Sequence, residues 1–338
     1  MNVLITGCEG FIGSYLVQTL LDNGYEVWGI DNFSKYGKID KNYYSNKKFH
    51  FIEGDVKNTD LLVEIGKNCE HFIALAAMIG GIGYFHRLAY DLLSENEKIL
   101  CSTFDAAIKL YKNNNLKKIS VVSSSMVFEN AFKFPTPEEH INEIPPPDST
   151  YGFQKLACEY YAKGAYEQYG LPYTILRPFN CVGIGEITPV KDREDKKKFD
   201  MALSHVVPDL TVKILKNQYP VEILGDGNQI RHYTSGKDLA RGIMLSLENK
   251  NALNNDFNLS SPVSTSVLEL AEKIFKKINP DIEFKYISVK PFTYDVQKRI
   301  PDTSKSFKLL GFKTQESLDD ILDEVIPWIK NELEKGNI

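Results

Sequence analysis

Short apolar runs alternate with longer amphipathic stretches through the first 180 residues of the chain. The runs hold few polar residues, which is typical of strands that are covered on both faces of a parallel sheet. They predict strands at Asn2–Thr6, Glu26–Ile30, Phe49–Ile52, Phe72–Ala76, Lys118–Ser123 and Tyr173–Leu176. The amphipathic stretches predict helices at Ile12–Asp22, Asp60–Gly66, Leu92–Tyr111 and Tyr151–Tyr169. This alternation predicts an α/β protein with a doubly wound parallel sheet.

The alternation loosens after about residue 180, where proline-rich and charged segments begin. One apolar stripe runs through the last predicted helix, as expected for a helix that faces a core. The unbroken charged run Lys191–Lys198 favours a solvated loop, and a loop that closes over a ligand is the alternative. Helices are predicted at Leu203–Lys216, Lys237–Glu248, Val267–Ile278 and Ser317–Leu333.

Composition sets broad limits on the function. The 338 residues include 40 basic and 45 acidic side chains, for a formal net charge of −5. A nucleic-acid-binding protein usually carries a basic field or stripe, and neither is visible. No apolar run approaches the roughly 20 residues of a membrane-spanning helix, and the N-terminus does not resemble a signal peptide. The five cysteines are scattered without metal-ligand spacing, so we expect a cytoplasmic protein with free thiols, no metal, no nucleic-acid partner and no membrane contact.

Three glycines follow the first predicted strand, in Gly7-Cys-Glu-Gly10-Phe-Ile-Gly13, and a helix follows them. Such glycines allow a tight turn and let the backbone approach a diphosphate, which binds to the N–H groups at the start of the helix. The second strand ends at Asp31, where a carboxylate accepts both ribose hydroxyls and repels the 2′-phosphate of NADP. Asp55, after the third strand, is suited to the adenine amino group. The pattern therefore predicts NAD as the cofactor.

A tyrosine and a lysine stand four residues apart in Tyr151-Gly-Phe-Gln-Lys155, on one face of a predicted helix. Only this pair opens a long helix, and it follows a strand that ends in Ser123-Ser124-Ser125, at the sheet edge where ligands bind. Oxidising a carbinol requires a base for the hydroxyl proton, and a neighbouring ammonium together with a nicotinamide ring favours the phenolate form of a tyrosine. The same spacing also starts at Tyr43, Tyr44, Tyr233, Tyr286 and Tyr294.

Several motifs together resemble one enzyme family. They are Thr6-Gly-x-x-Gly-Phe-Ile-Gly13, Ser123–Val127, Tyr151-x-x-x-Lys155, Leu176-Arg-Pro-Phe-Asn180, Gly225-Asp-Gly-Asn-Gln-Ile-Arg231 and Arg299-Ile-Pro-Asp302. On these residues the chain is similar to the extended short-chain dehydrogenases/reductases, in the family of NAD-dependent nucleotide-sugar epimerases and dehydratases. The resemblance covers essentially the whole chain and implies a Rossmann fold. It also implies a homodimer through the helices Leu92–Tyr111 and Tyr151–Tyr169.

The resemblance implies a role for each matching residue. Ser124, Tyr151 and Lys155 are expected to be catalytic, and Arg231 and Arg299 to clamp the diphosphate of the sugar nucleotide. Further substrate contacts are expected from Ser125, Met126, Asn180 and Val206. Contacts to NAD are expected from Gly7, Gly10, Phe11, Ile12, Gly13, Asp31, Asn32, Asp55, Val56, Ala76, Ala77 and Asn96, and from the catalytic Tyr151 and Lys155.

The motifs also predict two domains, of which the second is a smaller, discontinuous α/β domain. We expect residues 1–180, rejoined by about 229–262, to bind NAD. Residues 181–228 and 263–338 are then expected to bind a UDP- or GDP-linked sugar.

Departures from the family pattern favour one reaction. The 4,6-dehydratases of the family carry Asp-Glu where this chain has Ser125-Met126, and neither replacement can act as that acid/base pair. GDP-mannose 3,5-epimerases and GDP-fucose synthases place a cysteine at the position of Met126, and a thioether has no proton to transfer. The glutamate of the UDP-glucuronate decarboxylases is also missing. The remaining set of Ser124, Tyr151 and Lys155 suffices for C4 epimerisation through a transient 4-keto sugar with tightly bound NAD.

Two other functions stay open at this point. The stretch Ala76–Gly83 resembles GDP-mannose 3,5-epimerases more than UDP-galactose epimerases, so GDP-sugar 3,5-epimerisation, or another C4 oxidoreductase or dehydratase reaction, is the alternative. A non-catalytic protein that senses NAD is a remote alternative, because Ser124, Tyr151 and Lys155 are all present.

Overall fold

The computed structural model describes residues 1–80, 87–186, 205–291 and 296–337. The charged run 191–198, the glycines of 81–83, the beginning of the helix expected from Leu203 and the Tyr-x-x-x-Lys that starts at Tyr294 lie outside the described residues.

A seven-stranded sheet with the order β11-β6-β5-β4-β1-β2-β3 forms the centre of the fold, and every neighbouring pair in it is parallel. This confirms the predicted α/β class with a doubly wound parallel sheet. All strands except β11 lie within two residues of a predicted apolar run. The strands are β1 (Asn2–Thr6), β2 (Glu26–Asp31), β3 (Phe49–Glu53), β4 (His71–Ala74), β5 (Lys118–Val122), β6 (Tyr173–Pro178) and β11 (Asn255–Leu259).

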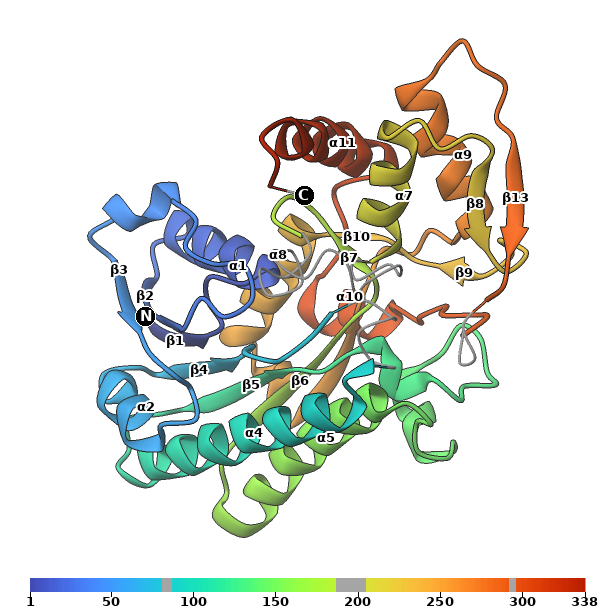
Figure 1. Ribbon diagram of the computed structural model, residues 1–338. Helices are drawn as coiled ribbons and strands as arrows, with labels where there is room; N and C mark the ends of the chain where they lie inside the picture. Colours follow the sequence, from blue (N-terminus) through green and yellow to red (C-terminus); the bar gives the residue numbers. More distant parts are fainter. Residues whose placement is uncertain (81–86, 187–204, 292–295, 338) are drawn as a thin grey trace.

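Helices cover both faces of this sheet (Figure 1). Side chains alternate between the two faces along a strand, so Val3 and Ile5 pack into the cluster formed with α1 (Phe11–Asp22) and α8 (Gly236–Leu247). Leu4 packs into the opposite cluster, which is formed with α2 (Thr59–Gly66), α4 (Ala89–Lys112) and α5 (Thr150–Tyr169). The sheet is thus buried on both sides, and ligands can reach it only at its ends.

Strand β11 is absent from the predicted strands, because its sequence Asn-Asp-Phe-Asn-Leu lacks an apolar run. Its polar side chains are buried in specific hydrogen bonds instead. The backbone N–H of Asn258 donates to the Glu138 carboxylate at 2.8 Å, and the Asn258 amide donates to the carbonyls of Thr136 and Asp302. These partners lie far away in the sequence, so no local pattern could predict the strand.

A third hydrophobic cluster lies beyond the carboxyl ends of the strands (Figure 1). It is built by α7 (Val206–Leu215), α9 (Val267–Ile278) and α11 (Leu318–Glu334), together with β8 (Val221–Leu224), which pairs in parallel with β13 (Tyr286–Val289). The apolar stripe predicted for the last helix is confirmed here, through Leu318, Ile321, Leu322, Val325, Ile326 and Ile329. The shorter elements are β7 (Cys181–Val182), β9 (Ile230–Arg231), β10 (Thr234–Ser235), β12 (Thr265–Ser266), α10 (Ser304–Leu310) and the 3-10 turns η1 (Asn42–Ser45), η2 (Ser125–Phe128), η3 (Glu138–Asn142) and η4 (Lys250–Ala252). Among the described helices, none is long and apolar enough to cross a membrane.

A buried ion-pair network joins the sheet to α5. The guanidinium of Arg177, on β6, is fully buried and bonds to both carboxylate oxygens of Glu159 on α5, at 2.8 and 2.7 Å. It also pairs with Asp256 on β11 at 2.8 Å, and Lys305 on α10 pairs with the same carboxylate at 2.5 Å. Burial alone would raise the pKa of Asp256, but Arg177 and Lys305 hold that pKa below its usual range. The network therefore holds four elements, β6, α5, β11 and α10, in one arrangement.

Replacing Arg177 tests how much of the fold depends on this network. Removing one partner of a buried pair leaves an uncompensated buried charge, which costs about 3–5 kcal/mol. We expect Arg177→Met to lower the free energy of unfolding by about that amount, measured by urea denaturation. The matched control is Lys273→Met, which breaks an exposed pair with Asp319 and should change stability by less than about 1 kcal/mol. Equal, small effects of the two substitutions would contradict a structural role for the network.

Candidate active site

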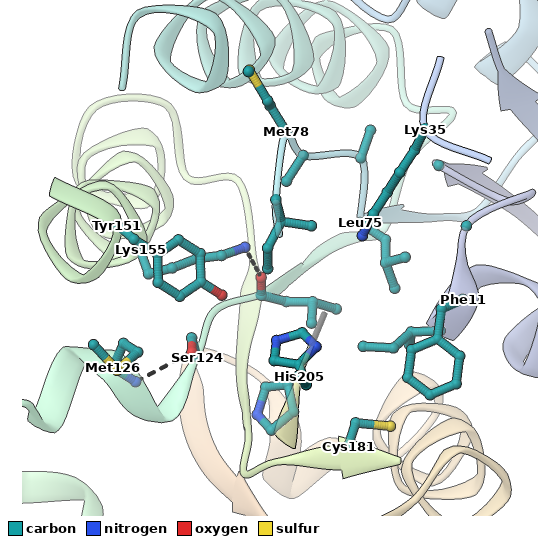
Figure 2. A pocket seen from close by; sticks show the side chains of 18 of the residues that line it. Phe11, Lys35, Leu75, Met78, Ser124, Met126, Tyr151, Lys155, Cys181 and His205 are labelled. Atoms are coloured by element: carbon teal, nitrogen blue, oxygen red, sulfur yellow. Dashed lines mark hydrogen bonds between the residues drawn. The ribbon is translucent and has the colours of Figure 1, made fainter. Parts of the chain in front are cut away.

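One cavity of about 1130 Å³ lies at the carboxyl ends of β1, β2, β4, β5 and β6 (Figure 2). These strand ends face the third hydrophobic cluster, which is built by α7, α9 and α11. Ligands of open parallel sheets bind at this edge. The lining residues come from both parts of the molecule, from Gly7 and Asp31 at the sheet to Val206, Arg231 and Arg299 beyond it. The cavity is therefore the place where the predicted site residues can meet.

The glycine turn forms one wall of the cavity, and helix α1 begins from it. Its N-cap residue is Gly10, which has no side chain to cap the helix, and the first turn of α1 has no acidic residue. The only acid in the turn, Glu9, is buried away from the cavity and accepts a hydrogen bond from Tyr43 at 3.3 Å. Phe11 and Ile12 line the cavity at the start of the helix. Uncapped N–H groups without a nearby acid fit the diphosphate of a dinucleotide.

The glycines of the turn are required for different reasons. A Cβ atom on Gly7 would lie 2.8 Å from the Ala76 Cα atom, and one on Gly13 would lie 2.1 Å from the Gly7 carbonyl oxygen. A Cβ atom on Gly10 would meet only that carbonyl, at 3.2 Å. Gly7 and Gly10 line the cavity, whereas Gly13 does not. Gly13 thus serves the close packing of α1 against the turn.

Asp31 ends β2 at the cavity and fixes the loop that follows it. Its two carboxylate oxygens accept the backbone N–H groups of Phe33 and Glu9, at 2.8 and 3.1 Å. Burial raises the pKa of this carboxyl group. The position is the one expected for a residue that binds the adenosine ribose.

Most of the other residues expected at the cofactor line the cavity: Asn32, Asp55, Val56, Ala76 and Ala77. Strand β4 ends at Ala74, two residues earlier than predicted, because the N–H groups of Leu75 and Ala76 donate to the Thr6 hydroxyl on β1. This turn brings the two alanines to the cavity. Asn96, by contrast, is buried and does not line the cavity.

Asn96 supports the cavity wall from behind. Its side-chain oxygen accepts the N–H of Met78 at 2.7 Å, and its amide donates to the Met78 carbonyl at 2.9 Å. A β-strand-like pair of bonds of this kind holds the segment that carries Ala76 and Ala77. The structure thus places Asn96 as a support of that segment.

Ser124, Tyr151 and Lys155 lie together on one side of the cavity, and Phe11 and Lys35 lie on the other (Figure 2). All three are buried, with 8%, 6% and 7% of their surface exposed. The Lys155 ammonium donates to the carbonyl of Val122 at 3.0 Å and lies 6.0 Å from the centre of the Tyr151 ring. The Ser124 oxygen accepts the N–H of Met126 at 3.2 Å, which leaves its own hydroxyl proton free to be donated to a ligand.

Local sequence explains why these three side chains meet. Ser149 caps α5 by accepting the N–H of Gly152 at 3.0 Å, so the helix begins at Thr150 and places Tyr151 in its first turn. A Cβ atom on Gly152 would lie 2.6 Å from Pro147 and 2.9 Å from the Met126 carbonyl. The glycine after Tyr151 therefore allows α5 to approach the serine turn. The structure confirms that, among the described Tyr-x-x-x-Lys pairs, this one opens a long helix.

Two arginines line the cavity on the side of the third hydrophobic cluster. Arg231 ends β9, and the N–H of Arg299 donates to the carbonyl of Ile230 at 3.2 Å, so the two residues lie on adjacent segments. Tyr233 lines the cavity beside them; burial raises the pKa of its hydroxyl, and the positive charges of Arg231 and Arg299 oppose that rise. A pair of guanidinium groups in a buried cavity is suited to a diphosphate.

The remaining residues expected at the substrate also line the cavity: Ser125, Met126, Asn180 and Val206. Asn180 adopts the left-handed conformation, with φ of 37°, and its amide donates to the His232 carbonyl at 3.2 Å. This bond joins the end of β6 to the segment that carries Arg231.

Many residues that line the cavity were not predicted, and four of them have polar side chains from two places in the chain. Lys35 and Tyr36 belong to the loop after Asp31, and Glu186 and His205 are hydrogen-bonded to each other. For Lys35, its nearness to Asp31 in sequence was the available signal. Glu186 follows the Asn180 motif, but nothing in the sequence pairs it with His205.

Comparisons with known proteins agree with this geometry. The sequence model of the NAD dependent epimerase/dehydratase family matches residues 3–260. The chain is 30% identical to a UDP-glucose 4-epimerase from Thermotoga maritima solved with UDP-glucose, over 98% of this chain and 100% of the other, with a TM-score of 0.81. It is 30% identical to a UDP-N-acetylglucosamine 4-epimerase from Methanobrevibacter ruminantium solved with UDP-N-acetylmuramic acid, over 98% of both chains, with a TM-score of 0.79. It is 27% identical to a UDP-glucuronic acid 4-epimerase from Bacillus cereus solved with UDP-glucuronic acid and NAD, over 98% of this chain and 99% of the other, with a TM-score of 0.81.

Two glycine substitutions separate folding from cofactor binding. Gly13→Ala forces a Cβ atom against the Gly7 carbonyl, so we expect a large loss of thermal stability. Gly10→Ala meets only a tight contact and should fold with a melting temperature within a few degrees of the unchanged protein. We expect Gly10→Ala to weaken NAD binding about 10-fold or more, measured by calorimetry, because its methyl group stands at the wall where the diphosphate approaches. Unchanged NAD affinity in Gly10→Ala would contradict this placement of the diphosphate.

Proposed function

The chain belongs to the NAD-dependent epimerase/dehydratase family, and from this premise we propose that it is a 4-epimerase of a UDP-linked sugar. Its cofactor is NAD. The observation that carries the proposal is the meeting of Ser124, Tyr151 and Lys155 in one cavity, between an uncapped helix N-terminus and two arginines. The 4-epimerases that the chain resembles, each solved with a UDP-linked ligand, support the same reaction.

In this proposal the residues around α1 hold the cofactor. When bound, NAD would supply the hydride chemistry at C4 of the sugar. The N–H groups of Phe11 and Ile12 at the start of α1 bind the diphosphate, and Asp31 binds the adenosine ribose. Asp55 is suited to the adenine amino group.

The catalytic residues handle the proton of the C4 hydroxyl group. Tyr151 takes this proton when the sugar is oxidised and gives it back when the ketone is reduced. The Ser124 hydroxyl donates a hydrogen bond to the same substrate oxygen and orients it. Lys155 stabilises the phenolate of Tyr151 by its charge, and its bond to the Val122 carbonyl fixes its position.

Inversion requires the 4-keto sugar to present its other face. Arg231, Arg299 and Asn180 hold the diphosphate of the substrate, so the nucleotide stays bound while the sugar turns. The serine turn carries Ser125 and Met126, which cannot act as the acid/base pair of a dehydratase. The proposed site therefore performs only oxidation and reduction at C4.

Proton NMR of the protein with UDP-glucose and with UDP-N-acetylglucosamine tests the reaction. We expect anomeric signals of the C4 epimer to appear without added NAD, because the cofactor is regenerated in each turnover. Tyr151→Phe should lower the rate by about 10²-fold or more, since it removes the group that moves the proton, while NAD stays bound. The control is Tyr286→Phe, an exposed tyrosine on β13 that does not line the cavity, which should leave the rate unchanged.

Three results would contradict the proposal. They are no conversion of any UDP-linked sugar, an unchanged rate in Tyr151→Phe, and conversion of GDP-mannose with deuterium entering at C3 or C5 in D₂O. The last result would support the 3,5-epimerase alternative, because hydride transfer confined to C4 exchanges no carbon-bound proton with solvent.

We also propose which segments of the chain bind each ligand. Residues 1–180 with about 229–262 bind NAD, and residues 181–228 with 263–338 bind the sugar nucleotide. Strand β11, within the second NAD-binding segment, completes the central sheet and supports this division. A cytoplasmic location and a role in carbohydrate biosynthesis stay predictions.

We further propose a homodimer through α4 and α5. The outer face of α5 exposes Phe153 and Tyr160, which lie two helical turns apart, with 47% and 66% of their surface accessible. Beside them, the exposed Cys101 on α4 contacts the Tyr161 hydroxyl at 3.1 Å. Large aromatic side chains at the surface favour contact with another chain.

Tyr160→Glu tests this interface. A charge in the centre of the paired helices should dissociate the dimer, so sedimentation equilibrium should report twice the monomer mass for the unchanged protein and the monomer mass for the variant. Phe307→Glu, at an exposed site on α10, is the matched control and should stay dimeric. A monomeric unchanged protein, or a dimeric Tyr160→Glu, would argue against the α4–α5 interface.

A further inference from the structure

We propose that Lys35 is a cofactor-binding residue whose ammonium group pairs with the diphosphate of NAD, opposite the N-terminus of α1. The inference rests on the proposed NAD site and adds to it a residue on the loop after β2. It makes Lys35 a determinant of how tightly the cofactor is retained.

The loop after β2 presents Lys35 to the cavity. Asp31 accepts the N–H of Phe33, and Phe33 adopts the left-handed conformation with φ of 56°, so the chain reverses directly after the strand. Figure 2 shows the Lys35 side chain extended into the cavity. The glycine turn and the segment after β4 line the same cavity.

Among the described residues, Lys35 differs from the other lysines that line the cavity. Lys57 and Lys98 both pair with Glu95, at 2.7 Å each, so their charges are already balanced. Lys155 donates to the Val122 carbonyl. Lys35 has no ion pair or hydrogen bond with any described residue, and its nitrogen lies 4.7 Å from the centre of the Tyr36 ring.

The surroundings of Lys35 disfavour an isolated charge. Burial lowers the pKa of its ammonium to about 8, and the negative charge of Glu186 only partly opposes this effect. Lys35 is half-buried and contacts the Tyr36 ring, and an anion that enters the cavity would stabilise its positive charge. The site is thus prepared for a negatively charged ligand.

The diphosphate of a dinucleotide is the anion that fits this place. It carries two negative charges, and the N-terminus of a helix supplies only about half of one positive charge. The first turn of α1 has no basic residue, and Glu9 is directed away from the cavity towards Tyr43. Lys35 therefore supplies the positive charge that the glycine turn lacks.

Calorimetry with NAD, NADP and UDP tests the assignment, after bound cofactor has been removed and its amount measured. Lys35→Met keeps the length of the side chain and removes the charge, and Lys35→Arg keeps the charge. The matched control is Lys38→Met on the same loop, because Lys38 is 71% exposed and already pairs with Glu53. Melting temperatures without ligand show whether each variant is folded.

We expect Lys35→Met to raise the Kd for NAD about 10- to 100-fold, the range of a charge-assisted hydrogen bond. Its NAD affinity should also depend less on salt concentration. Lys35→Arg should keep most of the affinity, Lys38→Met should stay within about twofold of the unchanged protein, and the Kd for UDP should be the same in all variants.

Three results would overturn the proposal: an unchanged Kd for NAD in Lys35→Met, a loss of affinity for UDP alone, and a loss for NADP alone. The second would assign Lys35 to the diphosphate of the substrate, and the third to a 2′-phosphate. Failure of the unchanged protein to bind NAD would instead contradict the proposed function, so the two failures are distinguishable.

Discussion

The buried guanidinium of Arg177 is the constraint on which the arrangement of the active site depends. A charge in the interior is tolerated only when its partners stay in place, and its partners are Glu159 on α5 and Asp256 on β11. The hydroxyl of Ser123 donates to the same Glu159 carboxylate at 2.7 Å. The residue before Ser124 and the helix that carries Tyr151 and Lys155 are therefore joined to one carboxylate. Precise placement of the catalytic groups follows from the same interaction that secures the edge of the sheet.

The sequence predicts those elements of the fold and site that are specified by residues close to one another along the chain. Strand β1, the glycine turn and α5 are specified by neighbouring residues: an apolar run, three glycines, and a serine cap before Tyr151. Strand β11 is specified by Glu138, Thr136 and Asp302, which are distant in sequence, and it was missed. Asn96 and Gly13 were expected at the cofactor from their motif positions, and neither lines the cavity: Asn96 bonds to the backbone of Met78, and a Cβ atom on Gly13 would meet the Gly7 carbonyl. Sequence position alone cannot distinguish a residue at the cavity from one that supports it.

The net charge of the whole chain and the charges that line the cavity also differ in what they indicate. The net charge of −5 argues against polyanionic partners, yet the ligands proposed for the cavity are themselves anionic. The cavity resolves this because its positive groups come from separate segments: the N-terminus of α1, and the guanidinium groups of Arg231 and Arg299. Acidic residues nearby are neutralised locally, as Glu95 is by Lys57 and Lys98. A few well-placed cations decide what binds, and the bulk charge does not.

Epimerisation places opposite demands on the two ligands, and the cavity is built for both. The cofactor must stay bound through oxidation and reduction, since its release between the two steps would leave a ketone without a reductant. The sugar must be held loosely enough to rotate and present its other face. At the proposed NAD end, Asp31 fixes its own loop by two hydrogen bonds. At the other end, the groups with the strongest charges, Arg231 and Arg299, are suited to a diphosphate and not to a sugar. Anchoring a ligand by its charged part frees its neutral part to rotate, and in the proposed mechanism this separation would let Tyr151 serve both faces of the same carbon.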